Sequence, residues 1–139
     1  MELEKVKIMK KILITLFLMV STSTCFSANW KTTGSLENGD ETYLDTSSIV
    51  VNYPTVTFWW LTNFQTPKLN KIENKYASSF LDQFQMNCSK RTTTLLYFTE
   101  YTEKFRKGDL IYSAKPDRDE NPIVPGSIME EVMRMVCKK

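Results

Sequence analysis

The sequence predicts an α+β domain in which an antiparallel β-sheet of about six strands carries a C-terminal helix packed on one face and one disulfide. Three observations lead to this fold class. Apolar and polar residues alternate through most of residues 28–113, as they do in half-buried strands. The last segment changes to the helical period. Two cysteines, an even number, remain once an N-terminal leader is removed.

The leader comes first in the chain, and residues 1–27 have the composition of a secretory signal. Its three parts follow in the expected order: Lys10-Lys11, the apolar run 12–20, and the small, mostly polar residues 21–27. The apolar run is too short for a spanning helix, which needs roughly 20 apolar residues. We therefore expect an exported chain, cleaved before Ala28 or Asn29, with no transmembrane span in its mature form.

Two alternatives within the leader stay open. Met9-Lys10-Lys11 is a more ordinary signal start than the charged residues 1–8, so Met9 is a second candidate for the initiator. Cys25 is a candidate for lipidation, but the preceding Thr22-Ser23-Thr24 lacks the aliphatic residue and the Gly or Ala that such a site normally has. Ordinary cleavage is favoured, and both the periplasm and the outer-membrane surface remain as final locations.

The strands follow between residues 30 and 113. The clearest one covers residues 55–65, where Val56, Phe58, Trp60 and Phe64 alternate with Thr57, Trp59, Leu61 and Asn63. Residues 76–88 and 92–102 give two more strands, and residues 30–35, 41–45 and 110–113 give three weaker ones. Turns are expected at 38–40, 66–67 and 107–109, and a single helical turn at 47–50.

A helix is predicted over residues 128–137. Ser127 is its N-cap, and Glu130 three residues later has the spacing of a capping box. Ile128, Val132, Met135 and Val136 share one face, and the methionines there are interpreted as core residues rather than as a metal or partner groove. Because Cys137 ends this helix and Cys88 ends a strand, a Cys88–Cys137 disulfide would fasten the helix to the sheet.

The charge balance argues against a nucleic-acid partner. Residues 1–27 hold four of the 18 basic and two of the 16 acidic residues, so the remainder has 14 of each and no net charge. A nucleic-acid partner normally requires a strong positive excess, so none is expected. The basic cluster Lys104, Arg106 and Lys107 is flanked by acids and is interpreted as a solvated loop.

Enzymatic chemistry finds little support in the sequence. The chain has no histidine, which removes the commonest general base and transition-metal ligand. Asp117, Asp119 and Glu120 are interrupted by Arg118 and lack the glycine and final glutamate of a calcium loop, so a polar loop is expected. We therefore predict no enzyme, no catalytic residues, no metal site and no cofactor.

Several segments follow one another in a recognisable order. They are Thr42-Tyr43-Leu44-Asp45-Thr46-Ser47-Ser48-Ile49, an aromatic strand, Lys75-Tyr76-Ala77-Ser78-Ser79 leading to Asn87-Cys88, a strand rich in Thr and Tyr, and a helix that ends in Cys137. In this order, and with its two cysteines, the chain resembles the surface-adhesin protein E family of Gram-negative bacteria. The resemblance covers nearly all of residues 28–139 and implies one adhesin E-like domain of antiparallel sheet and helix with one disulfide.

The resemblance also implies a function, the binding of host extracellular-matrix or plasma proteins such as vitronectin, laminin or plasminogen. The family's binding segment would fall between residues 65 and 88, and the candidate ligand-binding residues there are Lys68, Lys71, Lys75 and Tyr76. The alternative is a periplasmic structural or stress-related envelope protein that has no host ligand. The sequence predicts no oligomeric state.

Overall fold

The computed structural model describes residue 4 and residues 27–138. The predicted initiator Met9 and the lipidation candidate Cys25 lie outside these residues, as does nearly all of the predicted leader. Within the described part of the chain, no helix has the length and apolar character of a membrane span.

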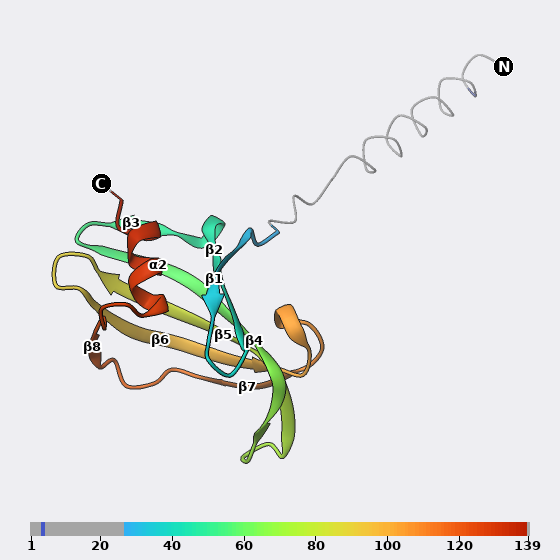
Figure 1. Ribbon diagram of the computed structural model, residues 1–139. Coiled ribbons are helices and arrows are strands. Elements are labelled where there is room, and N and C mark those ends of the chain that lie inside the picture. Colours follow the sequence, from blue (N-terminus) through green and yellow to red (C-terminus); the bar gives the residue numbers. More distant parts are fainter. Residues whose placement is uncertain (1–3, 5–26, 139) are drawn as a thin grey trace.

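An antiparallel sheet forms most of the fold (Figure 1). Six strands lie in the order β1-β2-β4-β5-β6-β7, with β3 paired to β4 and β8 paired to β6. Their bounds are Trp30–Ser35 (β1), Glu41–Asp45 (β2), Val50–Asn52 (β3), Thr55–Asn70 (β4), Lys75–Asn87 (β5), Thr92–Tyr101 (β6), Leu110–Ala114 (β7) and Glu120–Pro122 (β8). Two short 3-10 turns, η1 at Thr46–Ser48 and η2 at Lys104–Arg106, and the helix α2 at Ile128–Val136 complete it. The predicted fold class is confirmed, with two short strands in addition.

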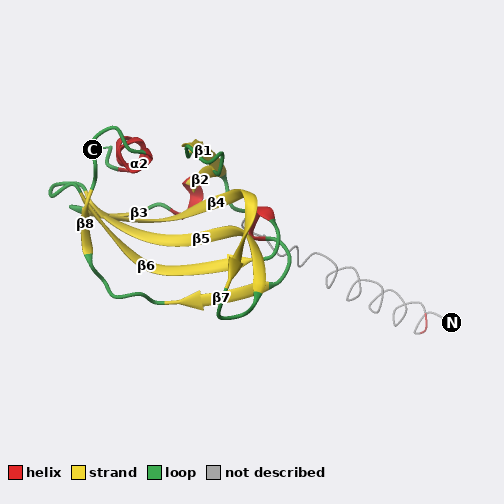
Figure 2. Ribbon diagram, turned by 60° about the horizontal axis from the view of Figure 1, so that its bottom comes forward, coloured by secondary structure: helices red, strands yellow, loops and turns green. Residues whose placement is uncertain are grey.

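The helix α2 covers one face of the sheet, as Figure 2 shows from the side. Val132 and Val136 are buried against apolar side chains of β2, β4 and β5. The buried side chains of this cluster are Leu44, Val56, Phe58, Met86, Ile123, Val132 and Val136. Because the pleat points alternate side chains to opposite faces, Val56 and Phe58 lie under the helix and Thr57 and Trp59 lie on the other side. The predicted alternation therefore sets the core.

A disulfide at one end and hydrogen bonds at the other fix the helix. Cys88 and Cys137 form the predicted disulfide, with Cα atoms 5.7 Å apart. At the other end, Ser127 Oγ accepts a hydrogen bond from the Glu130 amide at 3.3 Å, as expected of an N-cap. The Glu130 carboxylate accepts from the Gly126 amide at 2.9 Å, which lies one residue earlier than a regular capping box would place it. The helix is thus held at both of its ends.

Two predicted turns differ in the structure. The single helical turn expected at 47–50 begins one residue earlier, at Thr46, because the Asp45 carboxylate accepts from the Ser47 amide at 3.0 Å and caps η1 there. The turn expected at 66–67 was wrong, because β4 continues through both residues to Asn70. The chain therefore has a longer β4–β5 hairpin than the sequence predicts.

Candidate functional site

The β4–β5 hairpin extends beyond the sheet as an arm, defined here as residues 65–78 (Figure 1). The regular pairing of the two strands ends at Asn63 and Ser79 and resumes at Lys68 and Ala77. Four residues of β4 there oppose a single residue of β5, so the strand bulges and changes direction. Pro67 lies in this bulge, where its missing N–H removes no ladder hydrogen bond. The proline that suggested a turn instead marks the base of the arm.

Asp40, at the end of the β1–β2 turn, anchors one side of this base. Its carboxylate is 2% exposed and accepts hydrogen bonds from the Gln65 amide at 2.9 Å and from Lys68 Nζ at 2.7 Å. Burial alone would raise the pKa of Asp40, but the bonds from Lys68, Gln65 and Asn38 outweigh it and lower the pKa below its ordinary value. Lys68 Nζ also lies 3.9 Å from the ring centroid of Phe64.

Asn70 anchors the other side and shapes the tip. Its Nδ2 donates to Glu100 Oε2 on β6 at 2.7 Å. Its Oδ1 accepts from the amides of Ile72 and Glu73, both at 2.9 Å, which closes the turn between the two strands. Asn74 follows with a φ of 50°, a left-handed conformation that asparagine tolerates better than most residues. The tip therefore has a defined conformation without being buried.

The structure divides the four predicted site residues into two groups. Lys68 lies at the base of the arm, where its ammonium group is engaged by Asp40. Lys71, Lys75 and Tyr76 lie at the exposed tip, and Tyr76 is 62% exposed. The three are thus brought together, while Lys68 contributes to the support of the arm.

Two apolar residues at the tip were not predicted. Leu69 pairs with Tyr76 across the hairpin, so the two side chains share one face of the arm, and Ile72 in the turn is 73% exposed. Exposed large apolar side chains that lie together commonly mark a contact surface. They would have been found only if the strand had been continued past Pro67. The alternation of apolar and polar residues alone did not indicate that it continues.

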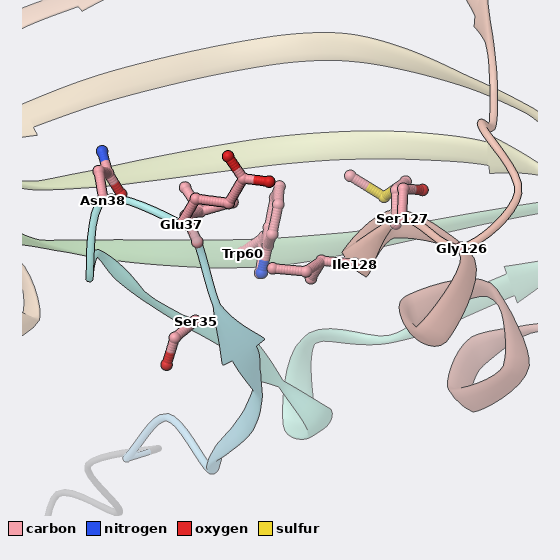
Figure 3. Close-up of a pocket in the computed structure, with 9 residues that line it drawn as sticks. Ser35, Glu37, Asn38, Trp60, Gly126, Ser127 and Ile128 are labelled. Atoms are coloured by element: carbon pink, nitrogen blue, oxygen red, sulfur yellow. The ribbon is translucent and has the colours of Figure 1, made fainter.

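A second surface feature is a hollow of about 680 Å³ between the β1–β2 turn and the N-terminus of α2. Figure 3 shows Glu37 and Asn38 of the turn on one side, Ile128 on the other, and the Trp60 ring between them. The Trp60 indole donates to Thr33 Oγ1 at 3.2 Å, so its polar edge is already satisfied. The hollow presents no pair of groups placed for acid–base chemistry.

The acidic segment considered for calcium has another role. Glu120 belongs to β8 and accepts hydrogen bonds from Thr92 Oγ1 and Lys90 Nζ, which lower its pKa. Asp117 and Asp119 are exposed in the segment before it. In residues 27–138, no group of three or more potential metal ligands occurs. This acidic segment therefore supports the edge of the sheet.

The chain is similar to known proteins in sequence and in fold. A family model described as surface-adhesin protein E matches residues 30–138. A structure of Haemophilus influenzae protein E aligns with a TM-score of 0.59 at 18% identity, covering 85% of this chain and 90% of that one. A crystal structure of protein E from non-typeable Haemophilus influenzae gives 0.58 and 18%, with coverage of 85% and 81%. At 18% identity, these similarities show that this chain and protein E share a fold and show nothing further. No curated protein sequence matches the chain.

Proposed function

We propose that this chain, which belongs to the surface-adhesin protein E family, is an exported binding protein whose arm contacts host extracellular-matrix or plasma proteins. The observation that carries the proposal is the combination at the arm tip of exposed apolar side chains and unburied lysines on a firmly anchored base. Vitronectin, laminin and plasminogen are the first partners to test. The family supports a surface adhesin, and the arm is the contact surface that we propose for it.

The apolar face of the tip would supply most of the contact energy. Tyr76 and Leu69 lie side by side on one face, and Ile72 adds a third exposed apolar side chain. Tyrosine is enriched among the residues that dominate binding energy, because its ring buries a large area and its hydroxyl remains hydrogen-bonded. Ordering costs would be small, because Asn70 already fixes the turn.

The lysines would set the rate and salt dependence of association. Lys71 and Lys75 are exposed, and no ion pair within the described residues engages either of them. Exposed charges steer a partner with an acidic patch, and this effect weakens as salt rises. Lys68 would act indirectly, because its ammonium is held by Asp40.

The test compares arm variants in binding to immobilised vitronectin, laminin and plasminogen at low and at physiological salt. Tyr76→Ala is expected to lower affinity by about tenfold or more, as is common when a central aromatic residue is removed. The double variant Lys71→Ala, Lys75→Ala should slow association and flatten its salt dependence. The matched control is Lys31→Ala, Lys115→Ala, which removes the same charge from exposed positions outside the arm.

Fractionation tests the location that this function requires. Protease treatment of intact cells should remove the protein if it lies on the surface. A purely periplasmic pool would contradict adhesion and would favour the structural or stress-related envelope role. Unchanged affinity of the Tyr76 and double-lysine variants at low salt would exclude the arm as the binding site.

A further inference from the structure

A groove of about 560 Å³ lies on the sheet face opposite α2. Its lining includes Trp59, Leu81 and Tyr97 from the three central strands, and it shares no residue with the arm. Trp59 alternates with Phe58, whose side chain is buried under the helix, so the groove opens away from the helix. The side view in Figure 2 agrees, since α2 covers the other face.

Four aromatic side chains line the groove. Trp59 and Tyr97 stand edge to face, with ring centroids 6.1 Å apart and an interplanar angle of 88°, and so form a corner. Trp30 from β1 and Tyr101 from β6 also line the groove, and the nearly buried Leu81 lies in its lining. Aromatic walls with a few polar groups are typical of small-ligand sites.

One cation lines this groove, and the backbone that carries it is in an unusual conformation. Arg106 and the preceding Phe105 have φ values of 61° and 55°, which are unfavourable for residues with side chains. Two buried polar residues hold them there: Asn63 Oδ1 accepts from the Phe105 amide at 2.8 Å, and Ser79 Oγ accepts from the Arg106 amide at 3.2 Å. Strained residues fixed in this way are common at binding sites.

The guanidinium of Arg106 has no carboxylate partner within residues 27–138. The acid in the groove wall, Asp45, is held in place by hydrogen bonds to its Oδ1, which accepts from the Asn29 amide at 2.9 Å and from the Ser47 amide and hydroxyl at 3.0 and 2.5 Å. The hydroxyls of Tyr97 and Tyr101 make no hydrogen bond to other described residues. The groove therefore offers a positive charge and hydrogen-bonding groups beside aromatic rings.

We propose that this groove binds a sugar residue that carries a carboxylate or sulfate group. The pyranose ring would stack its C–H face on Trp59 and Tyr97, and its anionic group would accept hydrogen bonds from Arg106, whose planar fork matches carboxylate and sulfate geometry. The sugar hydroxyls would meet the hydroxyls of Tyr97 and Tyr101. A peptide carboxylate would use the same arginine, but the four aromatic rings of the lining suit the C–H face of a pyranose ring, which favours a sugar.

The test uses the purified protein and named probes. N-acetylneuraminic acid, glucuronic acid and glucose 6-sulfate are titrated, with glucose as the neutral probe and a short peptide with a free C-terminal carboxylate as the competing class. The indole N–H signals of Trp30 and Trp59 in NMR spectra report binding. The Trp60 signal is an internal control, because its indole is bonded to Thr33 on the other face.

The expected result is that the acidic sugars shift the Trp30 and Trp59 signals and that glucose binds far more weakly. Arg106→Gln should lower affinity about tenfold or more, the usual effect of losing a charge-assisted hydrogen bond. Lys104→Gln, which removes the same charge in the same turn outside the groove, should leave it unchanged. A sialylated trisaccharide that binds more tightly than the free acid would identify the end of a glycan chain as the source, and equal affinity would identify the free sugar acid.

Three outcomes would overturn the proposal: no shift with any acidic sugar, equal binding of glucose and glucuronic acid, or binding of the peptide alone. The comparison of acidic and neutral sugars uses the unaltered chain, so it decides the matter even where Arg106→Gln disturbs the fold. A negative result for the groove does not contradict the proposed binding function of the arm, because the two surfaces consist of different residues and are tested by different assays.

Discussion

The free energy of unfolding should fall as the pH rises toward neutrality, and replacing Asp82 with asparagine should abolish this fall. Asp82 lies on β5 between Trp60 on β4 and Phe98 on β6. Glu100, two residues beyond Phe98 on β6, points to the same face. Burial among these rings, and then the nearby Glu100 charge, raise the pKa of Asp82 from 3.8 to about 7. The carboxyl is thus held neutral in the folded protein over a range in which it ionises in the unfolded chain.

The sign of the effect follows from proton binding. Between about pH 4 and pH 7, the folded state keeps the Asp82 proton and the unfolded state has lost it, so stability falls as the pH rises and is level above about 7. A pKa change from 3.8 to about 7 corresponds to at most about 4 kcal/mol. Because the side chain is only partly buried, water will screen part of this, and we expect about 1 to 2 kcal/mol between pH 5 and pH 8.

Urea unfolding followed by tryptophan fluorescence at several pH values measures this loss. Asp82→Asn should be about as stable as the unaltered protein near pH 5 and more stable near pH 8. Asp117→Asn, which neutralises an exposed acid, is the control and should leave the pH profile unchanged. The reasoning is refuted if the Asp82 carboxyl titrates near 4 in carbon-detected NMR, or if the two proteins lose stability in parallel.

Three further predictions concern the supports of the fold. Replacing Cys88 and Cys137 together by serine should lower the free energy of unfolding by about 4 kcal/mol, since the disulfide closes a separation of 49 residues; urea midpoints of the double variant and of the unaltered protein will show whether it does. Asp40→Asn should cost about 2 kcal/mol through its weakened bonds to Gln65 and to the arm lysine. Because the pKa of Asp40 is lowered on folding, its contribution is present above about pH 4 and lost in acid, so the unaltered protein should unfold more steeply than the variant as the pH falls. Ser127→Ala should cost about 1 kcal/mol through loss of the helix cap, measurable as a lower thermal midpoint, and an unchanged midpoint would contradict the capping role.

The sheet and helix were predictable because burial imposes a period on the sequence. Val56 and Phe58 must face the helix, so the residues between them face the other way, and Val132 and Val136 occupy the matching stripe of α2. The disulfide followed from two cysteines at the ends of elements. In each of these cases, the residues that make the contact are themselves visible in the sequence, through their apolar spacing or as cysteines.

The arm was not predictable in this way, because no core lies against its outward face. Beyond the bulge, Leu69 and Tyr76 are exposed, so burial does not enforce alternation there. Pro67 then dominates the local signal and suggests a turn, although a bulge accommodates proline equally well. The hydrogen bonds that hold the arm in place involve Asp40 and Glu100, which are distant in sequence and give no sequence signal near the proline.

The position of Arg106 escaped prediction for the same physical reason. Acids flank it in the sequence, which indicates a solvated loop. Its actual place depends on hydrogen bonds to the backbone of η2 from Asn63 and Ser79, which belong to other strands. Tertiary hydrogen bonds that impose left-handed backbone on residues with side chains have no local sequence signal.

Asn63 and Ser79 connect the two proposed surfaces. They are the last regular pair of β4 and β5 before the bulge from which the arm projects. Both side chains are turned to hold η2, since Asn63 accepts from the Phe105 amide and Ser79 donates to the Glu103 carbonyl at 2.6 Å. The register break therefore does two things at once: it directs the arm outward, and its last pair positions the turn that carries Arg106. Changes at Asp40 should disturb the base of the arm rather than the groove, whereas changes in this pair reach the groove first.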